Sequence, residues 1–480
     1  MTHRPHCSIV PPYLLSALAA SDDPRLQSSA RETMRVDESL RRARVTAEVR
    51  PTLDPTADAP PRLAPGTSAG PVRAVHDAEH GTVLPGTLVR GEGDPDTGDT
   101  EVTQAYDGLG ATWRLWQEGY DRTSLDGKGL PLVATVHYGQ DYDNAFWDGR
   151  QMVFGDGDGV IFLPFTRSLD VIGHELAHGV TQYTSGLNYQ GQSGALNESV
   201  SDVFGVLVVQ YLRGQTAAEA DWLVGADLLA PGVRGVALRS MAAPGTAYDD
   251  PRLGTDPQPA HWRDYVDTTA DNGGVHINSG IPNKAFHDLA VTLGGHAWEA
   301  PGQIWYDTVT GDIRADCDFE TFAGLTVAAA SARYGEGSRE HDAVRAAWAG
   351  VGLGPDAPAE QDDPDGPSGD VDAGVADGPG EPVPGPGTAV RVRRSGGVAG
   401  LVRERTVTLQ ELPDDDAHHW ATLLSAGRLR RIAEAARPAG PVPDAFSWSV
   451  HCDLPPVEVD LAEPALTPPV RDLLHRTVRG

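Results

Sequence analysis

His174 and His178 enclose Glu175 in the segment His174-Glu175-Leu176-Ala177-His178. On a helix, residues four apart lie on one face, so both imidazoles can reach one zinc ion while the glutamate takes a proton from zinc-bound water. Five-residue matches also occur by chance, and two exposed histidines on a surface helix are the alternative. The flanks favour a buried helix, because they supply an apolar face of Leu169, Val171, Ile172, Leu176 and Val180.

A third candidate ligand, Glu198, follows His178 by twenty residues inside a second helical pattern. Two histidines and one glutamate leave a fourth position for water, which is the open arrangement of a catalytic zinc site. Asp202, one turn beyond Glu198, is expected to accept a proton from a ligating imidazole, and Asn197 to do likewise. The residues themselves therefore predict a hydrolytic zinc centre.

Three segments resemble signature segments of the thermolysin family of zinc metallopeptidases: residues 173–202, 143–159 and 271–286. The likeness extends over roughly 73–353. It implies zinc bound by the two histidines and the glutamate just described, with Glu175 as general base. The expected activity is a neutral endopeptidase acting on protein or peptide substrates.

The resemblance also assigns residues around the metal. His276, oriented by Asp271, and Tyr189 would stabilise the oxyanion of the tetrahedral intermediate. Taken alone, the histidine would be a buried structural residue and the tyrosine a packing aromatic. The expected contacts to the substrate main chain come from Asn144, the backbone of Ala145, and Arg239. The expected pocket for the residue after the scissile bond is apolar and selects a large hydrophobic side chain: Phe162, Phe165, Val171 and Leu238.

One departure from the family concerns calcium. Positions that hold paired calcium ions in thermolysin-like members are occupied here by Val209, Leu223 and Ala226. Asp170 and Asp221 remain, but two carboxylates do not easily supply the six to eight oxygens that calcium takes. The double calcium site is therefore expected to be absent.

The N-terminal residues 1–72 are polar and irregular by pattern, and SIVPPYLLSAL resembles the short propeptide of the protealysin-like branch of this family. The alternative is a disordered tail with a chance apolar patch. Cys7 is a candidate zinc-capping thiolate, although a thiol without a role is the preferred interpretation. Pro11–Pro12 interrupts the apolar run, so an ordinary signal peptide is not expected, and the protein is either cytoplasmic or exported by another route.

The C-terminal end adds two segments. Residues 354–387 are an acidic, Pro/Gly-rich linker, in which 355–387 contain nine acids and no Lys or Arg. Residues 388–480 regain strand and helix patterns and resemble emfourin, a small proteinaceous inhibitor associated with protealysin-like enzymes. The chain's own propeptide and this domain are therefore the expected intramolecular inhibitors, with a substrate- or surface-binding module as the alternative for the latter. The loop around Ser395-Gly396-Gly397 is the expected contact surface.

The elements that must position the site are strands first and helices second. Strand-like runs at 130–139 and 159–165 precede helical patterns from 169 onward, which predicts an α+β class with a β-rich lobe, a helical lobe (together 73–353) and a small α+β domain. A net charge of −30 argues against nucleic acid, and no apolar stretch is long enough for a bilayer. A catalytically dead zinc protein that acts through its last domain is the rival hypothesis, and intact Glu175, His276 and Tyr189 count against it.

Overall fold

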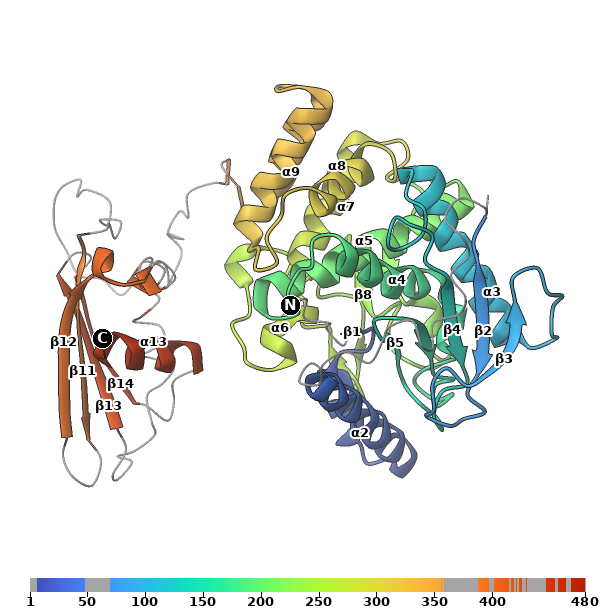
Figure 1. Ribbon diagram of the computed structural model, residues 1–480, viewed down its shortest axis with the longest axis horizontal. Helices are drawn as coiled ribbons and strands as arrows, with labels where there is room; N and C mark the ends of the chain where they lie inside the picture. Colours follow the sequence, from blue (N-terminus) through green and yellow to red (C-terminus); the bar gives the residue numbers. More distant parts are fainter. Residues whose placement is uncertain are drawn as a thin grey trace, which may run out of the picture. The chain divides into compact units, whose positions relative to one another are not determined.

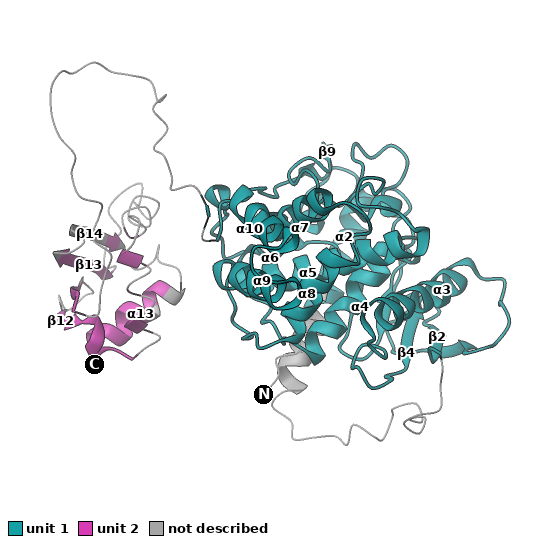
Figure 2. Ribbon diagram, turned by 90° about the horizontal axis from the view of Figure 1, so that it is seen from above, with its two compact units in different colours: residues 1–362 teal, residues 363–480 magenta. Residues whose placement is uncertain are grey.

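The chain divides into two compact units, Met1–Asp362 and Asp363–Gly480 (Figure 2). The computed structural model describes residues 7–47, 70–354, 356–357, 387–396, 401–413, 416–417, 420, 423–424, 429, 446–453, 456–462 and 468–479. Nearly all of the predicted linker lies outside these residues. No helix of the described residues has the length and apolarity needed to cross a membrane.

The first unit contains a six-stranded sheet whose order is β1-β5-β6-β4-β2-β3 (Figure 1). Strands β2, β4 and β6 pair in parallel, while β1, β5 and β3 each run antiparallel to a neighbour. The strands are β1 (Cys7–Ser8), β2 (Arg73–Asp77), β3 (Thr87–Gly91), β4 (Leu132–Val136), β5 (Ala145–Trp147) and β6 (Met152–Phe154). The two-residue β1 comes from the N-terminal segment and extends the sheet at the edge formed by β5.

The prediction of a strand at 130–139 is confirmed by β4, but the strand predicted at 159–165 is wrong. The carboxylate of Asp158 accepts hydrogen bonds from the backbone N–H groups of Val160, Ile161 and Phe162. This local competition removes the donors that a sheet ladder would need, and only an isolated bridge from Phe162 to Leu229 forms.

Helices make up most of the rest of the first unit. From residue 169 onward they follow the predicted pattern, whereas the helix at 100–114 was not predicted. The helices are α3 (Thr100–Arg114), α4 (Leu169–Tyr183), α5 (Gly191–Arg213), α6 (Asp271–Asn278), α7 (Gly280–Leu293), α8 (Ala300–Thr310), α9 (Phe319–Tyr334) and α10 (Arg339–Gly350). Two short hairpin pairs join them: β7 (Leu223–Val224) with β8 (Arg239–Ser240), and β9 (Asp249–Asp250) with β10 (Gly254–Thr255). Helices α4 and α5 approach closely because Gly205 faces α4, where an added Cβ would lie 2.5 Å from the Asp170 carbonyl oxygen.

The N-terminal region is not irregular, so that prediction is wrong for residues 12–47. Helices α1 (Pro12–Ala19) and α2 (Pro24–Ala47) occupy it (Figure 1). Their apolar side chains are buried in the core of the first unit: Leu14, Leu15, Leu18, Leu26 and Ala30. Burial of this apolar stripe stabilises helices whose overall composition is polar.

The second unit contains a four-stranded antiparallel sheet of order β12-β11-β13-β14. The strands are β11 (Ala389–Gly396), β12 (Leu401–Thr408), β13 (Phe446–Asp453) and β14 (Pro456–Ala462), as predicted. Helix α13 (Pro468–Arg479) was not predicted from sequence; it buries Leu473 and Leu474 in the same core as Trp448. Most of the helix expected after residue 417 lies outside the described residues.

Candidate active site

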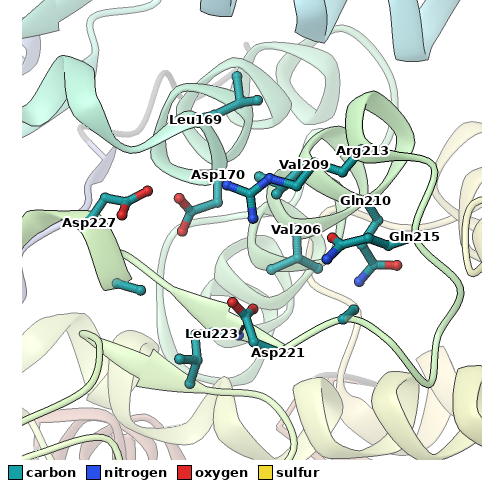
Figure 3. Close-up of a pocket in the computed structure, with 12 residues that line it drawn as sticks. Leu169, Asp170, Val206, Val209, Gln210, Arg213, Gln215, Asp221, Leu223 and Asp227 are labelled. Atoms are coloured by element: carbon teal, nitrogen blue, oxygen red, sulfur yellow. Dashed lines mark hydrogen bonds between the residues drawn. The ribbon is translucent and has the colours of Figure 1, made fainter.

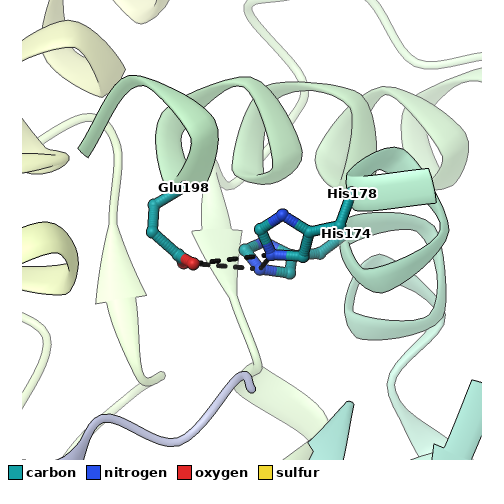
Figure 4. Close-up of side chains that lie close together, drawn as sticks. All are labelled: His174, His178 and Glu198. Carbon is teal, nitrogen blue, oxygen red and sulfur yellow. Dashed lines mark hydrogen bonds and ion pairs between the residues drawn. The ribbon is translucent and has the colours of Figure 1, made fainter. Parts of the chain in front are cut away.

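The three predicted metal ligands converge from two adjacent helices (Figure 4). His174 and His178 lie on α4, and their Nε2 atoms are 3.1 Å apart. Glu198 lies on α5. Its Oε2 is 3.5 Å from His174 Nε2, and its Oε1 is 3.5 Å from His178 Nε2. Ligand atoms bound at about 2.0–2.1 Å in a tetrahedron are about 3.3–3.4 Å apart, so the spacing suits zinc.

Partners on the far side of each imidazole fix its orientation. His174 Nδ1 is 2.7 Å from Asp202, and His178 Nδ1 is 2.8 Å from the side-chain oxygen of Asn197. Each ring therefore presents the Nε2 lone pair to the centre, as in carboxylate–histidine–zinc arrangements. Glu198 Oε2 is buried with no hydrogen-bond partner among the described residues, which a bound cation would satisfy.

Glu175 follows His174 on α4, and its side chain is buried. Its Oε2 accepts a hydrogen bond from the Trp147 backbone N–H at 2.9 Å, while its buried Oε1 has no partner among the described residues. Burial, reinforced by the charge of Glu198, raises the pKa of Glu175 well above its usual range. A carboxylate with a raised pKa is suited to receive and return a proton near neutral pH.

His276 approaches from α6, whose first turn is unusual. Asp271, Asn272, Gly273 and Gly274 all have positive φ, between 50° and 85°. This left-handed run, which glycine adopts without strain, turns the Asp271 carboxylate back onto His276: one oxygen accepts from the backbone N–H at 2.8 Å and the other lies 2.6 Å from Nδ1. Burial opposes the charged imidazole, but Asp271 and Glu198 outweigh it and raise the pKa of His276 to about 9. The prediction that Asp271 orients His276 agrees with this geometry.

The Tyr189 hydroxyl lies between Glu198 and His276. It donates to Glu198 Oε1 and lies 3.3 Å from His276 Nε2. The predicted proton donors of the site therefore lie together.

The N-terminal strand β1 and the two residues after it lie across this group. Ser8 O is 3.0 Å from His276 Nε2, and the Ile9 N–H donates to Ala145 O at 3.1 Å. Arg239, itself held by Asp202 through two hydrogen bonds of 2.9 and 2.7 Å, donates to Ile9 O at 3.2 Å.

Asn144 accepts from the next amide, Val10 N–H, at 3.0 Å. Beside these contacts, the side chain of Ile9 is wholly buried in the core cluster that contains the predicted apolar pocket of Phe162, Phe165, Val171 and Leu238. The groups that the resemblance assigned to the substrate main chain, at Asn144, Ala145 and Arg239, are thus all engaged by the chain's own N-terminal segment.

Comparison with known proteins agrees with this geometry. The model of the thermolysin metallopeptidase catalytic domain matches residues 72–182, and that of the thermolysin metallopeptidase alpha-helical domain matches 185–353. An extracellular metalloprotease of Pectobacterium carotovorum subsp. carotovorum is 51% identical over 354 residues, covering 74% of this chain and 98% of that protein. The chain belongs to the thermolysin family. It is a zinc metalloendopeptidase.

Other relatives refine the placement within the thermolysin family. Protease PrtS of Photorhabdus sp. (strain Az29) is 55% identical over 284 residues, covering 58% of this chain and 76% of that protein. The solved precursor of protealysin, a metalloproteinase from Serratia proteamaculans, is 48% identical with a TM-score of 0.65, covering 72% of this chain and 99% of that one. The Emfourin model matches residues 392–477. The chain is therefore a protealysin-like member with an emfourin-like C-terminal domain.

The residues that the resemblance places at the calcium positions line a small cavity of about 40 Å³ (Figure 3). Val209, Leu223 and Ala226 line it together with acidic residues. Both carboxylate oxygens of Asp170 already accept hydrogen bonds, one from the Ser168 hydroxyl and the other from the Gly225 backbone N–H. Burial raises the pKa of Asp170, which further opposes a fully charged carboxylate there.

Sequence reasoning missed several contacts of the site. The backbone of Trp147 holds Glu175, and the Ser201 hydroxyl lies 3.0 Å from His178 Nδ1. Position alone could have suggested Ser201, which lies one residue before Asp202 on the ligand helix. Nothing local signals the role of Trp147, because its side chain does not take part in it.

Proposed function

We propose that the enzyme cleaves peptide bonds on the amino side of large hydrophobic residues, with His174, His178 and Glu198 as the zinc ligands and Glu175 as the base. The observation that carries this is the convergence of the two Nε2 atoms and the Glu198 carboxylate beside an unpartnered Glu175 oxygen. Bound zinc supplies an activated water and polarises the scissile carbonyl. Side chains of the protein carry out the proton transfers and stabilise the oxyanion.

Glu175 takes the proton of the attacking water on Oε1 while the Trp147 N–H holds its other oxygen. It then returns the proton to the leaving amine. His276 and Tyr189 donate to the oxygen on which negative charge develops, and a donor of this kind contributes about 3–4 kcal/mol. Asp271 keeps the His276 ring in position.

Substrate is held by the groups that now hold the N-terminal segment. Asn144 and the Ala145 carbonyl bind main-chain N–H groups, and Arg239 binds the carbonyl that follows the scissile bond. The buried apolar surface of Phe162, Phe165, Val171 and Leu238 favours Leu, Ile or Phe in the adjoining pocket.

Two segments of the chain restrain this activity in our proposal. Residues up to 72 act as an intramolecular inhibitor, because Ser8, Ile9 and Val10 use the substrate-binding groups and thereby exclude other chains. The emfourin-like domain, 388–480, is the second inhibitor, held by the acidic tether at a high effective concentration. Ser395 and Gly396 end β11, while Gly397 of the expected contact loop lies outside the described residues.

The proposal also covers calcium and location. Two observations support the loss of the double calcium site: both Asp170 oxygens already accept hydrogen bonds, and part of the cavity lining is apolar. The name of the Pectobacterium relative, an extracellular metalloprotease, favours export over a cytoplasmic location.

Glu175→Gln tests the central role. The variant should retain zinc by elemental analysis, because its ligands are untouched, and should lose casein hydrolysis and self-processing. Glu118→Gln, at an exposed glutamate that accepts from Tyr211, is the matched control. Near wild-type turnover by Glu175→Gln would refute the assigned mechanism.

The inhibitory role of the last domain has its own test. A chain that ends at Leu353 should be more active than the full chain once both have lost the propeptide. Equal activity would leave the binding-module alternative in place.

A further inference from the structure

The N-terminal segment contacts the site through its backbone in a consecutive register. Ser8 offers its carbonyl to His276, Ile9 its N–H to Ala145 and its carbonyl to Arg239, and Val10 its N–H to Asn144. These are the groups that the proposed function assigns to a substrate, and the inference below rests on that function. The order of the contacts along the chain identifies the bond that lies in the reactive position.

We infer that the peptide bond between Ser8 and Ile9 is held as a substrate bond and is the first bond that the enzyme hydrolyses in its own chain. Its carbonyl oxygen lies 3.0 Å from the imidazole assigned to the oxyanion, and the nitrogen that would leave donates to Ala145 O at 3.1 Å. The residue after the bond, Ile9, is wholly buried and has the large aliphatic side chain that the apolar pocket should select.

Cleavage at either of the two neighbouring peptide bonds agrees less well with the contacts. A cut between Cys7 and Ser8 would require the small hydroxyl side chain of Ser8 in the apolar pocket. A cut between Ile9 and Val10 would require the Ile9 carbonyl at His276, whereas that oxygen is bound by Arg239. Only the cut between Ser8 and Ile9 therefore satisfies both the oxyanion donor and the carbonyl-binding arginine while placing a large aliphatic side chain directly after the bond.

The chain also runs in one direction through the site. β1 pairs antiparallel with β5, with Cys7 opposite Trp147 and Ser8 opposite Phe146. The residues after the bond then lead to Arg239 and Asn144, the groups assigned to the leaving half of a substrate. The N-terminal segment therefore runs through the site in the direction proposed for a substrate. Its chain direction does not protect the bond from hydrolysis.

The reaction is hydrolysis and consumes one water. Its oxygen bonds to the Ser8 carbonyl carbon, the bond from that carbon to the Ile9 nitrogen breaks, and Glu175 carries the proton to that nitrogen. The products are a carboxylate at Ser8 and an amine at Ile9.

Cleavage at this bond does not open the site, because the piece that begins with the new N-terminus at Ile9 stays anchored through α1 and α2. The buried leucines of α1 and Leu26 of α2 belong to the core of the unit. Ser29, Thr33 and Asp37 lie on one stripe of α2 and bond to the segment Tyr142-Asp143-Asn144. The cut chain therefore remains as a bound product, and activation needs a later cut or loss of α2.

Intact-mass measurement and N-terminal sequencing of the purified full-length chain test the inference. A new N-terminus at Ile9 should appear first, at a rate unchanged on dilution, while hydrolysis of an added fluorogenic peptide stays at the uncut level. The Glu175→Gln chain should keep the bond, also when active enzyme is added, because its own cleft shelters the segment.

A synthetic peptide with the sequence of residues 3–12 removes any dependence on folding of variants. Activated enzyme should cut it between Ser8 and Ile9, and Ile9→Asp should slow the cut at least about 100-fold, because the pocket is apolar. An enzyme that digests other peptides but leaves Ser8–Ile9 intact in the full chain, or first cuts elsewhere, overturns the inference and leaves the proposed function standing. An enzyme that cuts no peptide refutes the proposed function instead.

Discussion

Asp37→Ala should release the N-terminal helices from the catalytic region. The Asp37 side chain is 1% exposed and accepts hydrogen bonds from the Tyr142 hydroxyl and, at 3.2 Å, from the Asn144 side-chain N–H. Bonds to a charged acceptor contribute about 1.5–3 kcal/mol each, so losing both weakens docking by about 3–6 kcal/mol. At 1.4 kcal/mol per tenfold change, the undocked population rises by at least about 100-fold.

Trypsin sensitivity of α2 measures this population in a Glu175→Gln background, where self-cleavage does not interfere. Arg31 and Arg35 are exposed sites whose cleavage requires α2 to open, and the rate follows the open population when reclosing is fast. Glu32→Ala is the matched control, since within the described part of the chain that carboxylate is paired with exposed Arg35. A difference of less than about threefold between the two variants would show that the contacts of Asp37 do not anchor the helix.

Three further predictions concern ions, pH and specificity. Excess calcium should change the melting temperature of the activated enzyme little, and a large rise would contradict the loss of the double site. Hydrogen bonding to Asp156, with Asp99, raises the pKa of His137 to about 9, so its charged form stabilises the fold fully below about 6.5 and loses that effect as pH rises through 9. His137→Asn should flatten the fall in melting temperature over this window, and an unchanged slope would count against the ion pair. Leu238→Ala should shift cleavage maps of an unstructured protein toward larger residues, which unchanged maps would disprove.

The zinc centre could be predicted from the sequence because its geometry is local. His174 and His178 are one helical turn apart, and Glu198 and Asp202 follow one turn apart on the next helix. Helical periodicity fixes which side chains share a face, so spacing translates directly into convergence. The packing of α4 on α5 then requires only the close approach at Gly205.

The N-terminal helices were missed although a signal was present. Leu26, Ala30, Thr33 and Asp37 are spaced as one helical stripe, but its later members are polar and its partner surface is more than one hundred residues away. Thr33 and Asp37, at the polar end of this stripe, form hydrogen bonds with residues distant in sequence. From the sequence alone such a stripe resembles the start of a disordered segment. The same holds for α13, where two prolines and three arginines obscure buried leucines.

The latency that we propose for the full chain cannot depend on occupation of the cleft alone. Residues 8–10 make contacts that any good substrate would make, and a substrate bound in this way is cut and released. What distinguishes the N-terminal segment is its continuation into α1 and α2, whose buried leucines and polar stripe bind outside the reacting groups. Binding energy at that distance is the same for the intact and the cut chain, so hydrolysis gains nothing from it. On this proposal the N-terminal segment is a substrate whose product does not leave, and the strength of its inhibition is set by α2 rather than by residues 8–10.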